Sequence, residues 1–175
     1  MSKTILLLLR DIAIALAIML AILFFFRPTI VFEHSMENTL HPRDYVILSK
    51  QAYTFGDVKR GDIVVFKSEI EDTEHGGVKN LIKRVIALPG DTVEIKDDKV
   101  FLNGNEIQES YLKDGVTSGN IPETIIGEEE FFMMGDNRLV SKDSRDPEVG
   151  LIAANDISGK VIFRLFPLSS AGTLH

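Results

Sequence analysis

A serine and a lysine are the residues of this chain best suited to carry out chemistry together. Ser35 lies shortly after a hydrophobic N-terminal segment, and Lys83 lies within the apolar stretch Leu81–Ile86. A serine hydroxyl needs a base to become a nucleophile. A lysine can be that base only when it is neutral near pH 7, well below its ordinary pKa of about 10.4, and burial among apolar side chains favours this. From its sequence setting alone, Lys83 is more simply interpreted as a solvated lysine on a strand. Its assignment as a base therefore depends on a partner such as Ser35.

The histidines offer a weaker set of bases. His34 adjoins Ser35, and neighbouring side chains on an extended strand point to opposite faces. A Ser-His-Asp triad could therefore form only through His41 or His75, and ordinary surface positions fit both of these better. The histidines lack the spacing of metal ligands, and the absence of cysteine excludes thiol catalysis and disulfides. We expect neither a metal nor a cofactor.

The hydrophobic segment predicts a membrane anchor. Its clean run, Ile12–Phe26, reaches the length of a membrane span, about 20 residues, when Ile5–Leu9 is added. Arg10 and Asp11 interrupt the run and can pair with each other or reach the interface. Pro28 disfavours helix at the preceding residue and marks the expected exit. No small-x-small site follows, which favours a retained anchor over a cleavable signal peptide, and the lack of a polar face disfavours a buried core helix.

Charge and length set the expected organisation. Lys3 and Arg10 favour a cytoplasmic N-terminus, and a net charge of −7 argues against a general nucleic-acid-binding surface. Residues 1–28 are predicted to form a cytoplasmic tip and single-pass membrane anchor. Residues 29–175 are predicted to form an extracytoplasmic catalytic domain in contact with membrane lipid, with a small β insertion at about 92–130.

The chain after the anchor is predicted to be mainly β. Short runs rich in β-branched residues alternate with turn sequences, and no stretch after residue 40 has a long helical period. Tight turns are expected at Lys96–Lys99 and Asn103–Asn105. The expected strands cover residues 44–48, 62–66, 93–95, 100–102, 131–134 and 160–165, and the expected loops cover 69–77 and 112–127.

Four sequence segments together resemble one enzyme family. Ser35–Leu40, Arg60–Phe66, Lys83–Asp91 and Gly135–Arg145 resemble S-M-x-P-T-L, R-G-D-I-V-x-F, K-R-V-[IV]-x-x-P-G-D and G-D-N-R-x-x-S-x-D-S-R. In this order, after an N-terminal anchor, they resemble the bacterial type I signal peptidases, and the match spans nearly the whole chain. The resemblance implies an antiparallel β-sheet catalytic domain. It also implies a Ser/Lys endopeptidase that trims secretory preproteins with small residues at the cleavage site.

The resemblance implies a role for each site residue. Ser35 would be the nucleophile and Lys83 the general base, at a position where relatives in the endoplasmic reticulum have histidine. Ser141 would hydrogen-bond to the Lys83 amine and orient it. The charged residues that would shape the site are Asp143 and Arg145, as an ion pair, and Arg84 nearby. The apolar residues that would line pockets for small substrate side chains are Met36, Leu40, Leu81 and Ile82.

Two positions depart from the family pattern. Asn38 replaces the usual proline, although asparagine can also occupy a turn. Glu33 stands where serine or glycine is common, and an ionised carboxylate cannot donate the oxyanion hydrogen bond that some members take from serine. These departures leave open a specialised enzyme, or a weakly active or inactive homologue acting as an assembly factor in surface-polymer or pilus biogenesis. The presence of Ser35, Lys83 and Ser141 favours activity, and the anchor argues against the related self-cleaving repressor-type proteins.

Overall fold

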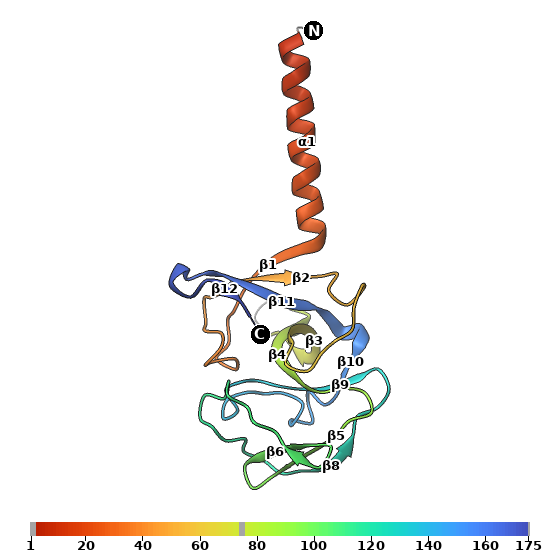
Figure 1. The fold of residues 1–175 in the computed structure, drawn as a ribbon, viewed down its shortest axis with the longest axis vertical. Helices are drawn as coiled ribbons and strands as arrows, with labels where there is room; N and C mark the ends of the chain where they lie inside the picture. Colours follow the sequence, from red (N-terminus) through yellow and green to blue (C-terminus); the bar gives the residue numbers. More distant parts are fainter. Residues whose placement is uncertain (1–2, 74–75, 175) are drawn as a thin grey trace.

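A long, solvent-exposed helix precedes a β-rich domain in the computed structural model, which describes residues 3–73 and 76–174. The helix, α1 (Lys3–Phe25), buries no residue and extends away from the domain (Figure 1). It is the one helix of the described residues that is long and apolar enough to cross a membrane. Arg10 and Asp11 pair within it, with Nη2 and Oδ1 2.9 Å apart, so the two charges do not interrupt the helix.

The helix ends earlier than the position of Pro28 predicts. It stops at Phe25, and β1 (Phe26–Ile30) begins at the next residue. The last carbonyls of a helix lack partners within the helix, and here Lys50 supplies donors for two of them. Its backbone N–H donates to the Phe25 carbonyl at 3.0 Å, and its Nζ donates to the Leu23 carbonyl at 2.8 Å. The helix end is therefore fastened to the sheet.

The larger sheet of the described residues has eight strands in the order β1-β2-β11-β3-β4-β9-β10, with β12 paired to β11. All of its pairings are antiparallel. Its other strands are β2 (Tyr45–Ser49), β3 (Ile63–Glu71), β4 (Val78–Ala87), β9 (Glu130–Met134), β10 (Ile152–Ala153), β11 (Ile157–Phe166) and β12 (Gly172–Thr173). The short 3₁₀ helices Ala154–Asp156 and Leu168–Ser170 flank β11. The expected mainly antiparallel β fold is confirmed.

A second sheet of four strands follows β4 in the chain and lies at the end of the domain away from α1 (Figure 1). Its order is β7-β6-β5-β8. The strands are β5 (Thr92–Lys96), β6 (Lys99–Leu102), β7 (Asn105–Glu106) and β8 (Ile121–Ile125). Asp97, Asp98, Asn103 and Gly104 all have positive φ, as two-residue turns between twisted strands require. The two turn predictions are confirmed.

The two loop predictions need correction. The segment 112–127 is not all loop, because β8 pairs antiparallel with β5 within it. Pro122 suggests a loop by sequence, but β8 lies at the edge of its sheet, where proline does not disrupt the hydrogen bonding. The loop expected at 69–77 is shorter, because β3 runs to Glu71 and β4 begins at Val78.

Packing places two segments of the chain next to each other at the centre of the larger sheet. In one apolar cluster, Met36 and Leu40 pack with core residues of β2 and β3, which holds the segment after β1 against the sheet. In another, Leu81 and Val85 pack with Val64 and other residues across β3 and β9. Strand β4 thus lies between β3 and β9, and its residues are fixed from both sides.

Candidate active site

Ser35 and Lys83 meet in the structure although they are far apart in the sequence. Ser35 lies in the turn that follows β1, and Lys83 lies in the middle of β4, opposite Val64 of β3. Lys83 Nζ is 2.8 Å from Ser35 Oγ, within hydrogen-bonding distance. Lys83 is 0% exposed and Ser35 is 6% exposed. A hydroxyl and an amine therefore touch in a place with little access to water.

Burial makes Lys83 a usable base. The removal of its ammonium group from water lowers the pKa of Lys83 to about 8. The negative charges of Glu33, Asp143 and Asp136 act against this shift, and the positive charge of Arg145 adds to it. With a pKa near 8, about a tenth of the Lys83 side chains are neutral at pH 7. That fraction is far larger than for a lysine in water.

Ser35 lies in a compact turn. The backbone N–H groups of Thr39 and Leu40 both donate to the Met36 carbonyl, at 2.9 and 2.8 Å. Asn38 lies within this turn, so asparagine does occupy the place of the family's usual proline. The anchoring of Met36 and Leu40 in the core keeps the turn, and with it Ser35, against the sheet.

A second turn backs Ser35 from the other side. Asn137 donates its backbone N–H to the Ser35 carbonyl at 3.0 Å and its side-chain amide to the His34 carbonyl at 3.1 Å. A Cβ atom at Gly135 would overlap both Ser141 Oγ and the Ser35 carbonyl oxygen. Only glycine, which has no side chain, lets this turn approach Ser35 and Ser141 so closely.

Ser141 lies beside the pair but makes no hydrogen bond with its hydroxyl in the described residues. Its Oγ is buried and has no partner, so the expected bond to the Lys83 amine is not formed in this structure. A buried hydroxyl without a partner is uncommon, because the loss of its water contacts is then uncompensated. An orienting role for Ser141 stays a prediction.

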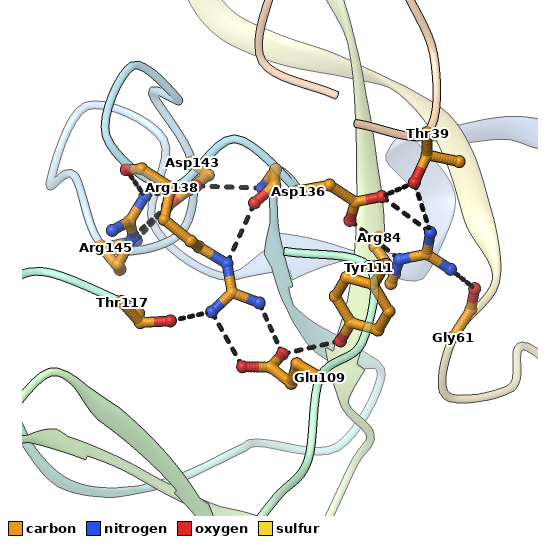
Figure 2. Close-up of polar contacts among 11 residues, drawn as sticks. Thr39, Gly61, Arg84, Glu109, Tyr111, Thr117, Asp136, Arg138, Asp143 and Arg145 are labelled. Atoms are coloured by element: carbon orange, nitrogen blue, oxygen red, sulfur yellow. Dashed lines mark hydrogen bonds and ion pairs between the residues drawn. The ribbon is translucent and has the colours of Figure 1, made fainter. Parts of the chain in front are cut away.

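The charged residues that the sequence predicts to shape the site form one buried and one partly buried ion pair at the turn (Figure 2). Arg145 holds Asp143 in a bidentate pair at 2.8 and 2.9 Å, and Asp143 also accepts the backbone N–H of Gly135 at 3.1 Å. Arg84 holds Asp136 in the same way, at 2.9 and 2.7 Å. These pairs fix both the start and the end of the turn that backs Ser35.

Asp136 also connects this turn to the turn that carries the nucleophile. The Thr39 hydroxyl donates to Asp136 Oδ2, and Arg84 Nη2 reaches the same hydroxyl at 3.3 Å. The sequence-based prediction names no role for Thr39 or Asn137. Thr39, Asp136 and Asn137 could nevertheless have been identified from the sequence, because each lies inside a segment that resembles a family pattern.

A cavity of about 610 Å³ opens beside the pair. Ser35, Met36 and Ile82 line it, and so does the exposed carboxylate Glu33. Leu40 and Leu81 are not among its lining residues, because both are buried in the core clusters. Of the four apolar residues expected to line a pocket, the structure therefore brings two to the cavity.

The histidines are poorly placed to replace Lys83. The His34 ring is paired with Glu37 at 2.6 Å, on the outside of the nucleophile turn. His41 is exposed, and its described bonds, both with Asp44, use its backbone N–H and carbonyl and not its ring. His75 lies outside the described residues. Burial and contact with Ser35 thus favour lysine as the base.

Comparisons with known proteins assign the chain to a family. A family profile described as "Signal peptidase, peptidase S26" matches residues 4–166. Signal peptidase I P of Bacillus subtilis subsp. natto is 38% identical over 90% of this chain and 88% of its own length. Signal peptidase I T of Bacillus subtilis is 37% identical over 90% of this chain and 84% of its own length. The chain belongs to the signal peptidase family, peptidase S26.

Proposed function

We propose that the protein is a membrane-anchored serine endopeptidase that removes signal peptides from secretory preproteins, with Ser35 as nucleophile and Lys83 as general base. The observation that carries this proposal is the 2.8 Å contact between Lys83 Nζ and Ser35 Oγ in a buried setting. The cavity beside the pair gives a peptide access to the hydroxyl. The names of the relatives, each called a signal peptidase I, support preproteins as the substrates.

The chemistry follows from the two groups in contact. The neutral Lys83 amine takes the proton of Ser35 as Oγ attacks the scissile carbonyl. The resulting ammonium then protonates the leaving amine, and an acyl-enzyme forms. Lys83, neutral again, takes a proton from the water that attacks the ester, and its ammonium returns that proton to Ser35 Oγ as the product acid leaves. The backbone N–H of Ser35 is a donor for the oxyanion of both tetrahedral intermediates.

A cleavage assay tests the proposed function directly. The purified full chain in lipid or detergent is expected to cut a preprotein at one bond after a small residue, as shown by the mass of both products. The Ser35→Ala variant is the matched control and should leave the preprotein intact. If the wild-type protein binds preproteins but cuts none, the assembly-factor alternative gains support and the peptidase proposal fails.

We expect the protein to stay in the membrane by means of α1. A helix of 23 residues spans about 35 Å, enough for a hydrocarbon core of about 30 Å. After carbonate extraction the full chain should remain with the membrane fraction. Protease added to intact protoplasts should degrade the domain that follows Pro28. Release of the intact chain would contradict the anchor, and a protected domain would contradict the orientation.

Glu33 is expected to restrain the enzyme on ordinary substrates. Its carboxylate lines the cavity close to Ser35, and its charge favours the protonated form of Lys83. Glu33→Ser should therefore raise the turnover of a generic preprotein, because it adds a possible oxyanion donor and removes that charge. One oxyanion donor can change the rate of a serine peptidase by on the order of a hundredfold.

Two further variants separate the causes. Glu33→Ala removes the charge without adding a donor, so an equal gain in both variants would assign the effect to Lys83 alone. Glu123→Ser removes an exposed carboxylate from the small sheet and should change nothing. If Glu33 recognises a basic residue of a dedicated substrate, that substrate should be cut more slowly by Glu33→Ser. Equal rates for wild type and Glu33→Ser on both substrates would remove Glu33 from the mechanism.

A further inference from the structure

The segment that connects the small sheet's β7 to its β8 returns to the active site. We call residues 107–118 the strap. Two of its polar side chains are buried where ordinary loop residues would be solvated: Glu109 is 4% exposed at its side chain, and Thr117 is 1% exposed. Figure 2 shows both of them aimed at Arg138, a residue of the turn that backs Ser35.

The first contact is an ion pair. Glu109 accepts two hydrogen bonds from Arg138, at 3.0 Å from Nη1 and 2.5 Å from Nη2, and Thr117 Oγ1 also contacts Nη1. The Arg138 side chain is 1% exposed. The removal of two charges from water costs about as much as their attraction returns. Such a pair therefore adds little net stability and is better understood as a device that fixes geometry.

The Glu109–Arg138 ion pair acts on the turn through a further N–H donor of Arg138. Its Nε donates to the Gly135 carbonyl at 3.0 Å. Gly135 is the residue whose missing side chain lets the turn pack against Ser141 and the Ser35 carbonyl. Glu109 thus fixes the Arg138 guanidinium, and that guanidinium fixes Gly135, which packs directly against the Ser35 carbonyl. The strap also contacts Arg145, whose Nη1 donates to the Ser118 carbonyl at 2.9 Å.

The second contact reaches the other ion pair. The Tyr111 hydroxyl donates to Glu109 Oε1 at 2.6 Å, and its ring lies 4.0 Å from the Arg84 guanidinium carbon. Burial raises the pKa of Tyr111, so the hydroxyl keeps its proton and remains a donor. The Lys113 backbone N–H donates to the Asp136 carbonyl at 3.2 Å. Through Arg138 and Tyr111, the single carboxylate of Glu109 therefore connects the strap both to Gly135 and to the Arg84–Asp136 ion pair.

From these contacts we propose that Glu109 is a positioning residue: it holds Arg138 and Tyr111 so that the turn beginning at Gly135 keeps Ser35 in place. The small sheet is then part of the catalytic apparatus, because it supplies the strap. This proposal rests on the proposed function for its kinetic consequences. The contacts on which it depends do not involve substrate, so they can be tested separately.

The test uses the full chain in detergent with Glu109→Gln, which removes the charge and keeps the shape. We expect kcat for a preprotein to fall by about tenfold or more with KM unchanged, because a small displacement of a catalytic group has effects of that order. Glu109→Asp should recover part of the loss. The matched control is Glu106→Gln, three residues away, which loses only an exposed pair with Lys99. All rates are measured below the unfolding temperature of each variant.

Hydrogen exchange gives a second measurement that needs no activity. Residues 33–40 should exchange faster in Glu109→Gln than in wild type, and Glu106→Gln should match wild type. A folded Glu109→Gln protein with wild-type kcat would overturn the proposal. If that variant does not fold, Tyr111→Phe removes only one hydroxyl and should still lower kcat severalfold; an unchanged kcat there would likewise overturn it. If the wild-type protein cuts no preprotein, the proposed function fails, and exchange at residues 33–40 alone decides on the strap.

Discussion

Ser35→Ala and Lys83→Ala are each expected to lower kcat/KM for preprotein cleavage by on the order of a millionfold, as in serine peptidases that lose their nucleophile or base. Lys83→Arg should be as inactive, because a guanidinium stays protonated at any working pH. Lys83→Met is the sharper control, since it fills the same buried space without an amine. Ser35→Ala and Lys83→Met should remain folded at the assay temperature, so their loss of activity reports the missing hydroxyl or amine. Substantial turnover by Lys83→Arg would remove lysine from the mechanism.

The same assignment fixes the sign of the pH dependence. Only the neutral amine can accept the Ser35 proton, so kcat/KM should rise with pH and level off above the pKa of Lys83. Burial lowers that pKa to about 8, which places the acid limb there. A limb near 6.5, the ordinary pKa of histidine, would instead indicate a histidine base. Measurement of kcat/KM at substrate concentrations far below KM reports the free enzyme.

The second large effect is expected at the ion pair between Arg84 and Asp136. Their side chains are 2% and 0% exposed. Asp136→Ala leaves the guanidinium buried without its carboxylate, and the loss of one partner of such a pair costs about 3–5 kcal/mol of unfolding free energy. We expect a drop of this size in denaturant titrations, and it is measured most simply on the full chain in detergent.

A surface pair provides the comparison. Glu94→Ala breaks a partly exposed pair with Lys96 and should cost about 1 kcal/mol or less. The double variant Arg84→Met/Asp136→Leu should recover much of the lost stability, because it removes both buried charges. It should not recover activity, since Thr39 loses both of its charged partners. A loss below about 1 kcal/mol in Asp136→Ala would contradict the buried-pair argument.

Sequence patterns were sufficient for the elements with strong local signals. The apolar run predicts α1, and alternating β-branched runs predict strands at the right places. The prediction that Ser35 and Lys83 act together rests on segments with a family pattern, and the structure brings the two side chains into contact. Sequence proximity to the reacting pair was a poor guide to the pocket: Leu81 is a near neighbour of Lys83 in the chain, but its side chain packs against Val64 in the core.

Other features depend on contacts between distant segments and leave no local trace. Glu109 has the sequence setting of a solvated loop carboxylate, and only the folded chain brings Arg138 to it. Strand β8 contains Pro122, and its edge position becomes visible only when the sheet is assembled. The end of α1 at Phe25 depends on donors from Lys50, which lies far along the chain.

The fastening of α1 by Lys50 sets a distance. Because Lys50 donates hydrogen bonds to both the Phe25 and the Leu23 carbonyls, rotation of the domain about the end of the helix is restricted. Ser35 follows Phe25 by ten residues, and a chain of that length reaches at most roughly 35 Å. If α1 spans a bilayer as proposed, Ser35 lies within roughly 35 Å of the bilayer surface. A substrate anchored in the same bilayer would then have to present its scissile bond within that distance, which limits how far from its membrane segment it can be cut.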